Sequence, residues 1–110
     1  MQKFSLDALA RELLERAATA GGGHTAHTVV GGHELVLRQT MVAMIAGSAL
    51  AEHESPGEAT LYVVHGRVRL NAGDASWEVR TGDILVIPDA RHDLLAIEDS
   101  AILLTVAKRI

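Results

Sequence analysis

The chain has 110 residues, of which 48% are apolar and 22% are charged, values typical of one globular domain rather than of a disordered chain. Its formal charge of −4, without a cluster of Lys and Arg, argues against nucleic acid as a partner. Because it contains no cysteine, a disulfide framework, a thiolate metal site and a thiol nucleophile are excluded. The longest apolar run, 41–46, is too short to span a membrane, and no signal-peptide pattern opens the chain, so we expect a cytoplasmic protein that does not bind membranes.

The first predicted element is an amphipathic helix over residues 4–18. Its apolar positions recur at the spacing of one helix face: Leu6, Leu9, Leu13 and Leu14. Ser5 has the side chain of an N-cap, and the glycines at 21–23 favour the end of the helix. We therefore expect residues 1–23 to form a helix with a glycine-rich connector, and residues 24–110 to form the main domain.

Turn signals then separate eight short runs of strand-forming residues. The expected strands are 34–46, 50–54, 60–64, 67–71, 76–80, 84–87, 93–97 and 101–107. Eight short strands with regular turns predict an all-β fold, either a closed barrel or a jelly roll. His24 and His27 precede these runs beside the three glycines, which argue against a helix there, and we interpret both as solvated residues of a connector.

Two segments of the chain carry a pattern with defined spacing. Residues 47–66, GSALAEHESPGEATLYVVHG, resemble the first motif of the cupin family, G-x5-H-x-H-x3-E-x6-G. Residues 82–92, GDILVIPDARH, resemble its second motif, G-x5-P-x-G-x2-H. The chain length and the turn pattern also agree with a single-domain cupin. The resemblance implies a double-stranded β-helix, or jelly-roll barrel, preceded by one short N-terminal α-helix.

The match is incomplete at the positions that hold a metal in many cupins. His53 stands at the first ligand position, but Ser55 replaces the second histidine and Ala59 replaces the glutamate. His92 comes one residue earlier than the second motif requires, and strict spacing would select Asp93 instead. Because side chains alternate between the two faces of a strand, the sequence leaves open which of these two residues faces the barrel interior.

The two remaining histidines, His53 and His92, would place two imidazoles inside the barrel. Catalytic zinc sites use three protein ligands, and non-haem iron oxygenases use two histidines and one carboxylate, so a metal centre here needs a recruited carboxylate. The candidates are Glu54, Glu58 and Asp93, with Glu58 next to the expected position. The sequence thus favours a barrel without a tightly bound metal. The alternative is a divalent zinc, iron, manganese or nickel ion at His53, His92 and Glu58.

Other lumen residues are expected from the strand that begins near Arg38 and Gln39, one of which should reach the lumen or its mouth. The expected ligand-binding residues of the lumen are His53, Ser55, His92, Gln39 and Met41. An apolar lumen with a few convergent polar groups has the composition of a small-molecule pocket.

Three functions are compatible with these residues. The favoured one is a cupin that binds a small molecule in its barrel, or serves as a regulatory accessory protein, with a lost or weakened metal site. The second is a metal-dependent dioxygenase, isomerase or lyase, and the third is a metal-free enzyme in which His53 or His92 relays a proton. No residue is assigned as catalytic. The resemblance to small cupins also implies a homodimer, because pairing removes exposed edge strands.

Overall fold

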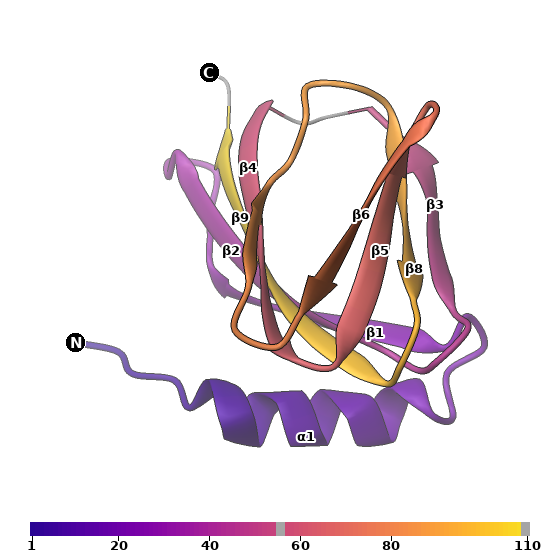
Figure 1. Cartoon of the computed structure of the whole chain (residues 1–110). Helices are drawn as coiled ribbons and strands as arrows, with labels where there is room; N and C mark the ends of the chain where they lie inside the picture. The colour runs from indigo at the N-terminus through magenta and orange to yellow at the C-terminus, as the bar shows by residue number, and fades with distance from the viewer. Residues whose placement is uncertain (55–56, 109–110) are drawn as a thin grey trace.

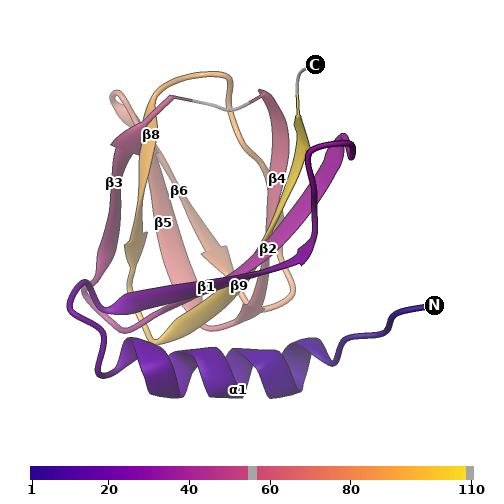
Figure 2. The ribbon, with the colours of Figure 1, turned by 180° about the vertical axis from the view of Figure 1, so that it is seen from behind.

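Residues 1–54 and 57–108, which the computed structural model describes, form one helix and nine strands. In chain order these are α1 (Leu6–Ala17), β1 (His24–Val30), β2 (Leu37–Met44), β3 (Ala49–His53), β4 (Gly57–His65), β5 (Arg67–Ala72), β6 (Ala75–Arg80), β7 (Ile84–Val86), β8 (His92–Ala96) and β9 (Ser100–Lys108). Two antiparallel sheets, of strand order β1-β2-β9-β4-β7 and β3-β8-β5-β6, face each other across the interior (Figures 1 and 2). This architecture confirms the predicted all-β jelly roll with one short N-terminal helix.

The helix forms where the apolar spacing predicts it and covers the outside of the five-stranded sheet (Figure 2). Ser5 is the N-cap, and its hydroxyl accepts a hydrogen bond from the amide of Ala8 at 3.3 Å. Leu13 is fully buried against the sheet, and the Thr25 hydroxyl donates to the carbonyl of Leu13 at 2.8 Å, which ties the helix to β1. No helix among the described residues is long and apolar enough to cross a membrane.

All eight strands expected from the sequence are present, but the strand β1 precedes them and was not expected. It pairs with β2 from His24 opposite Met44 to Val30 opposite Gln39, with an irregularity near its end. His24 and His27 therefore belong to an edge strand, and the interpretation of this segment as a connector was wrong. Strand pairing prevails here over the neighbouring glycines because β2 offers a complete row of backbone partners.

Alternation along the central strands β2 and β9 divides the apolar side chains between two clusters. The interior cluster, between the sheets, contains Val42, Met44, Ala59, Leu61, Val63, Val68, Leu70, Val79, Ile87, Leu94, Ala96, Ile102 and Val106. The outer cluster, between α1 and the five-stranded sheet, contains Ala10, Leu13, Ala17, Met41, Ala43 and Ala101. The five-stranded sheet is thus covered on both faces where the helix crosses it.

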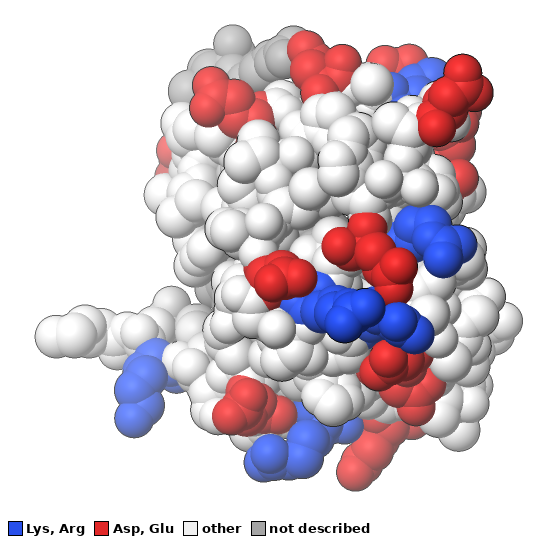
Figure 3. All heavy atoms as spheres, viewed as in Figure 1, with Lys and Arg blue, Asp and Glu red and all other residues white. Residues whose placement is uncertain are grey.

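Charged side chains gather on the exposed face of β5 and β6, where acidic and basic groups lie side by side (Figure 3). Arg67 bridges Glu78 at 3.0 Å and Glu98 at 3.3 Å. Charge on this face is therefore compensated locally and does not form a basic patch.

Candidate functional site

The fold brings His53 and His92 together at the junction of β3 and β8. The two residues are direct partners in the strand pairing, with their ring centroids 4.5 Å apart and the rings inclined at 65°. The pairing of these strands shifts by one residue between Leu50 and His53, and this irregularity sets the two histidines opposite each other. Two side chains separated by 39 positions in the sequence thus form one imidazole pair.

The structure also decides which residue of the second motif faces inward. His92 is only 4% exposed and shares its face of β8 with the interior residues Leu94 and Ala96. Asp93 points to the other face, where its carboxylate accepts a hydrogen bond from the amide of Asn71 at 2.8 Å. In the turn before β8, the Ala90 amide donates a hydrogen bond to the Pro88 carbonyl at 2.9 Å. This tight turn compensates for the spacing between Pro88 and His92, which is one residue shorter than in the second motif.

Both imidazoles are oriented by hydrogen bonds to the backbone two residues earlier. Nδ1 of His53 lies 2.9 Å from the carbonyl oxygen of Ala51, and Nδ1 of His92 lies 2.8 Å from that of Ala90. Because a carbonyl oxygen only accepts, each Nδ1 must carry a proton and donate it. In the neutral rings the lone pair then resides on Nε2, and neither Nε2 has a hydrogen-bond partner among the described residues.

The imidazole pair forms the polar part of a small cavity inside the barrel, of about 50 Å³. Its other walls are aliphatic and come from both sheets: Val42, Leu50, Leu61, Leu70, Ile87, Leu94, Ile102 and Leu104. His92 is buried, whereas His53 is exposed and marks the end of the cavity that reaches solvent. The site is therefore an apolar chamber with two nitrogen acceptors near its mouth.

Two of the residues expected in the lumen lie outside it. Met41 is fully buried in the outer cluster beneath α1, on the opposite face of β2 from Val42. Gln39 has the same orientation as Met41, and its amide donates to the Thr105 hydroxyl at 3.1 Å. The prediction that these two side chains line the lumen was wrong. Ser55, the third residue expected beside the two histidines, lies outside the described residues.

None of the three carboxylates considered as a metal ligand joins the histidines. Glu54 and Glu52 both accept hydrogen bonds from Arg91, at 3.1 and 3.0 Å, on the outer side of the β3–β8 pair. The bond to Glu52, and next the bond to Glu54, raise the pKa of the Arg91 guanidinium above its ordinary value. Asp93 is held by Asn71, as described above.

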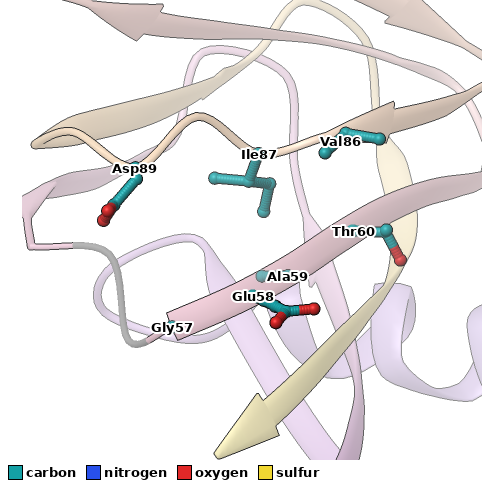
Figure 4. Close-up of a pocket in the computed structure, with 7 residues that line it drawn as sticks. All are labelled: Gly57, Glu58, Ala59, Thr60, Val86, Ile87 and Asp89. Atoms are coloured by element: carbon teal, nitrogen blue, oxygen red, sulfur yellow. The ribbon is translucent and has the colours of Figure 1, made fainter.

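Glu58, the preferred carboxylate, is exposed on the outer face of β4, whereas its neighbour Ala59 faces the interior. It lines a separate pocket of about 260 Å³ at the end of β4 and β7 (Figure 4). The residues around that pocket are Gly57, Glu58, Ala59, Thr60, Val86, Ile87 and Asp89. The prediction that Glu58 completes a metal centre was therefore wrong, because strand alternation turns it away from the barrel interior.

The described side chains do not fit a resident metal centre. Among residues 1–54 and 57–108, no group of three or more His, Asp or Glu side chains is arranged to hold a metal ion. His53 and His92 supply two nitrogen ligands, one fewer than catalytic zinc or a facial iron triad requires from the protein.

Most of the aliphatic lining was not identified from the sequence. Val42 and Ile102 lie within apolar runs, where nothing distinguishes a lumen residue from any other core residue. A parity argument based on His92 does find Leu94 on the same face of β8. On β3, the pairing shifts by one residue between Leu50 and His53, so the same parity argument based on His53 does not find Leu50.

No protein-family model matches this chain, and no curated protein matches it. Solved structures do match. A conserved protein of unknown function from Streptococcus pyogenes has a TM-score of 0.73 and 25% identity, with 83% of this chain and 79% of that chain covered. An RmlC-like cupin protein from Desulfovibrio desulfuricans has a TM-score of 0.66 and 25% identity, over 76% of this chain and 81% of that chain.

A larger enzyme has the same fold over part of its length. A salicylate 1,2-dioxygenase from Pseudaminobacter salicylatoxidans has a TM-score of 0.74 and 18% identity, and the match covers 91% of this chain but 33% of that chain. This likeness concerns the fold alone, since the identity is low and two thirds of the enzyme has no counterpart in the match. With its two facing antiparallel sheets and these structural neighbours, the chain has the cupin fold.

Proposed function

We propose that this chain binds a small molecule in the barrel cavity, with His53 and His92 recognising its polar part. The observation that supports the proposal is the combination of two imidazoles, whose Nε2 atoms have no partner among the described residues, with an otherwise aliphatic chamber. Ligand sites typically combine apolar walls with a few converging polar groups. His53 reaches solvent, which gives a ligand access to the chamber.

The size of the chamber limits how much of a ligand can enter. Its volume of about 50 Å³ is well below the roughly 300–1,000 Å³ of a pocket that encloses a drug-sized molecule. A ligand of that size would insert only a terminal group between the sheets. The remainder would lie at the mouth of the barrel, beside His53.

Xenon provides a test of whether the chamber admits guests, because it is compact, apolar and enters dry protein cavities. In NMR spectra of the methyl-labelled full chain under xenon pressure, we expect saturable shifts for Leu70, Leu94 and Ile102. Leu13, on the other side of the sheet, serves as the internal control and should not shift. The variant Val42→Ile adds one methyl group to the chamber wall and should weaken the xenon effect. Equal shifts at Leu13, or no saturable shifts at all, would contradict the proposal.

A metal-dependent cupin enzyme is the second candidate, and the facing imidazole pair is the observation that favours it. His53 and His92 would hold the ion, and a ligand or an additional group would have to supply the remaining donors. Metal analysis of the untagged protein distinguishes the two candidates. Close to one metal per chain, lost in both His53→Ala and His92→Ala but kept in His65→Ala, would favour the enzyme. No bound metal after reconstitution would leave the small-molecule proposal.

A further inference from the structure

The polar side chains that line the barrel cavity offer only hydrogen-bond acceptors. Each neutral imidazole uses its Nδ1 proton on a backbone carbonyl, so Nε2 of His53 and Nε2 of His92 both present lone pairs. The eight other lining residues are aliphatic and carry no polar side-chain atom. The complement to two acceptors in an apolar chamber is a hydrogen-bond donor.

While both imidazoles are neutral, charge complementarity disfavours the ionised alternatives to a neutral donor. A carboxylate would meet two lone pairs and would lose its hydration without gaining a donor in return. An ammonium group would be desolvated with no carboxylate among the lining residues to balance it. A neutral hydroxyl has neither difficulty, because its proton bonds to one Nε2 and its carbon stem contacts the aliphatic walls.

The volume of the chamber sets the length of the inserted group. One water needs about 10–15 Å³ of such a cavity volume, so about 50 Å³ holds roughly three to five groups of that size, such as a hydroxyl and a stem of two to four carbons. A guest of about three heavy atoms binds no tighter than the millimolar range. Higher affinity needs further contacts outside the chamber.

From these three observations we propose that the ligand inserts a primary hydroxyl on a short aliphatic stem, which donates to the imidazole pair of His53 and His92. This inference rests on the proposed function and adds the chemical class of the inserted group. It assigns the donor to the ligand and the acceptors to the protein.

Three probes of similar size test the class of the inserted group: ethanol, acetonitrile and acetate. Ethanol carries a neutral donor, acetonitrile carries an acceptor only, and acetate carries a negative charge. We expect ethanol to shift the ring signals of His92 and the methyl signals of Leu94 and Ile102 in a saturable manner. Its half-saturation should come at a concentration at least about fivefold below that of acetonitrile, the effect of one neutral hydrogen bond. Acetate should bind more weakly than ethanol.

Substitution of the histidines separates hydrogen bonding from simple filling of the chamber. In His92→Leu, ethanol and acetonitrile should lose their difference in half-saturation. If that variant does not fold, His53→Leu provides the same comparison, because His53 is exposed and its substitution leaves the core intact. The control His65→Leu changes an exposed histidine that does not line the chamber and should keep the fivefold preference.

The outcomes distinguish this inference from the proposed function. If xenon enters and ethanol binds no better than acetonitrile or acetate, the hydroxyl class is wrong but binding in the chamber stands. The same conclusion follows if xenon gives saturable shifts but ethanol gives none, because ethanol would then fail to displace water from the imidazole pair. If neither xenon nor any of the three probes produces saturable shifts, both proposals fail.

Discussion

Replacement of Gly66 by alanine should destabilise the protein more than any other single methyl addition at a turn. Gly66 connects β4 to β5 with φ of +100°, a conformation that costs an L-residue about 1–3 kcal/mol. An added Cβ would lie 2.4 Å from the Asp99 carbonyl oxygen and 2.8 Å from the Cα of Ser100, so backbone atoms would have to move. Side-chain rearrangement alone cannot relieve this contact.

The contact also disturbs a buried hydroxyl that fastens the corner. Ser100 is fully buried, and its Oγ, 2.4 Å from the added Cβ, accepts from the Arg67 amide at 3.0 Å. Loss of this hydrogen bond adds about 1 kcal/mol, and forcing packed atoms apart adds about 1–3 kcal/mol. Together with the backbone strain, Gly66→Ala should reduce the free energy of unfolding by about 3–7 kcal/mol.

Gly82→Ala is the matched control, because Gly82 has a similar φ of +88° but no atom within 4 Å of the added Cβ. It should cost only the backbone strain, about 1–3 kcal/mol. Equilibrium unfolding in urea, followed by circular dichroism, measures both variants. Equal losses for Gly66→Ala and Gly82→Ala would refute the reasoning, because the close approach of the Asp99–Ser100 backbone would then contribute nothing.

Three further predictions concern the helix, the surface and assembly. Leu13→Ala opens a cavity beneath α1 and should lower the free energy of unfolding by about 2–5 kcal/mol, whereas Leu35→Ala, at 43% exposed, should cost under about 1 kcal/mol; similar urea midpoints for the two would contradict the burial of the helix. Arg91→Met removes two exposed ion pairs and should leave the melting temperature nearly unchanged; a large drop would show that these pairs hold β3 to β8. The homodimer stays a prediction, and light scattering should give the mass of two chains. The first positions to test by substitution with aspartate are Ile84 and Val86, which are exposed on β7. A single-chain mass at every concentration would count against the homodimer.

The strands were predictable wherever one face of the sheet meets the core and the other meets water. Residues 67–71 alternate between polar and apolar side chains, and β5 lies there. The same rule gives no parity for the apolar run 41–46, because β2 is covered by the barrel interior on one face and by α1 on the other. The sequence analysis therefore placed Met41 in the lumen, whereas the structure shows that Val42 lines it.

The candidate site was predictable in its histidines but not in its surroundings. Both motif histidines meet as expected, yet the inward orientation of His92 depends on a tight turn and on a one-residue shift in the β3–β8 pairing. Neither feature has a signature in the sequence. Glu58 was placed near the histidines because it neighbours the expected position, although the alternation of β4 turns it outward.

The protonation of the two imidazoles tests the central claim most directly, because recognition in the chamber depends on lone pairs at Nε2. Nitrogen-15 NMR of the histidine rings, recorded at a pH where both are neutral, distinguishes a protonated ring nitrogen from one with a lone pair. We predict protons on Nδ1 and lone pairs on Nε2 in both His53 and His92. A proton on Nε2 of either neutral ring would contradict the account, since the chamber would then present a donor.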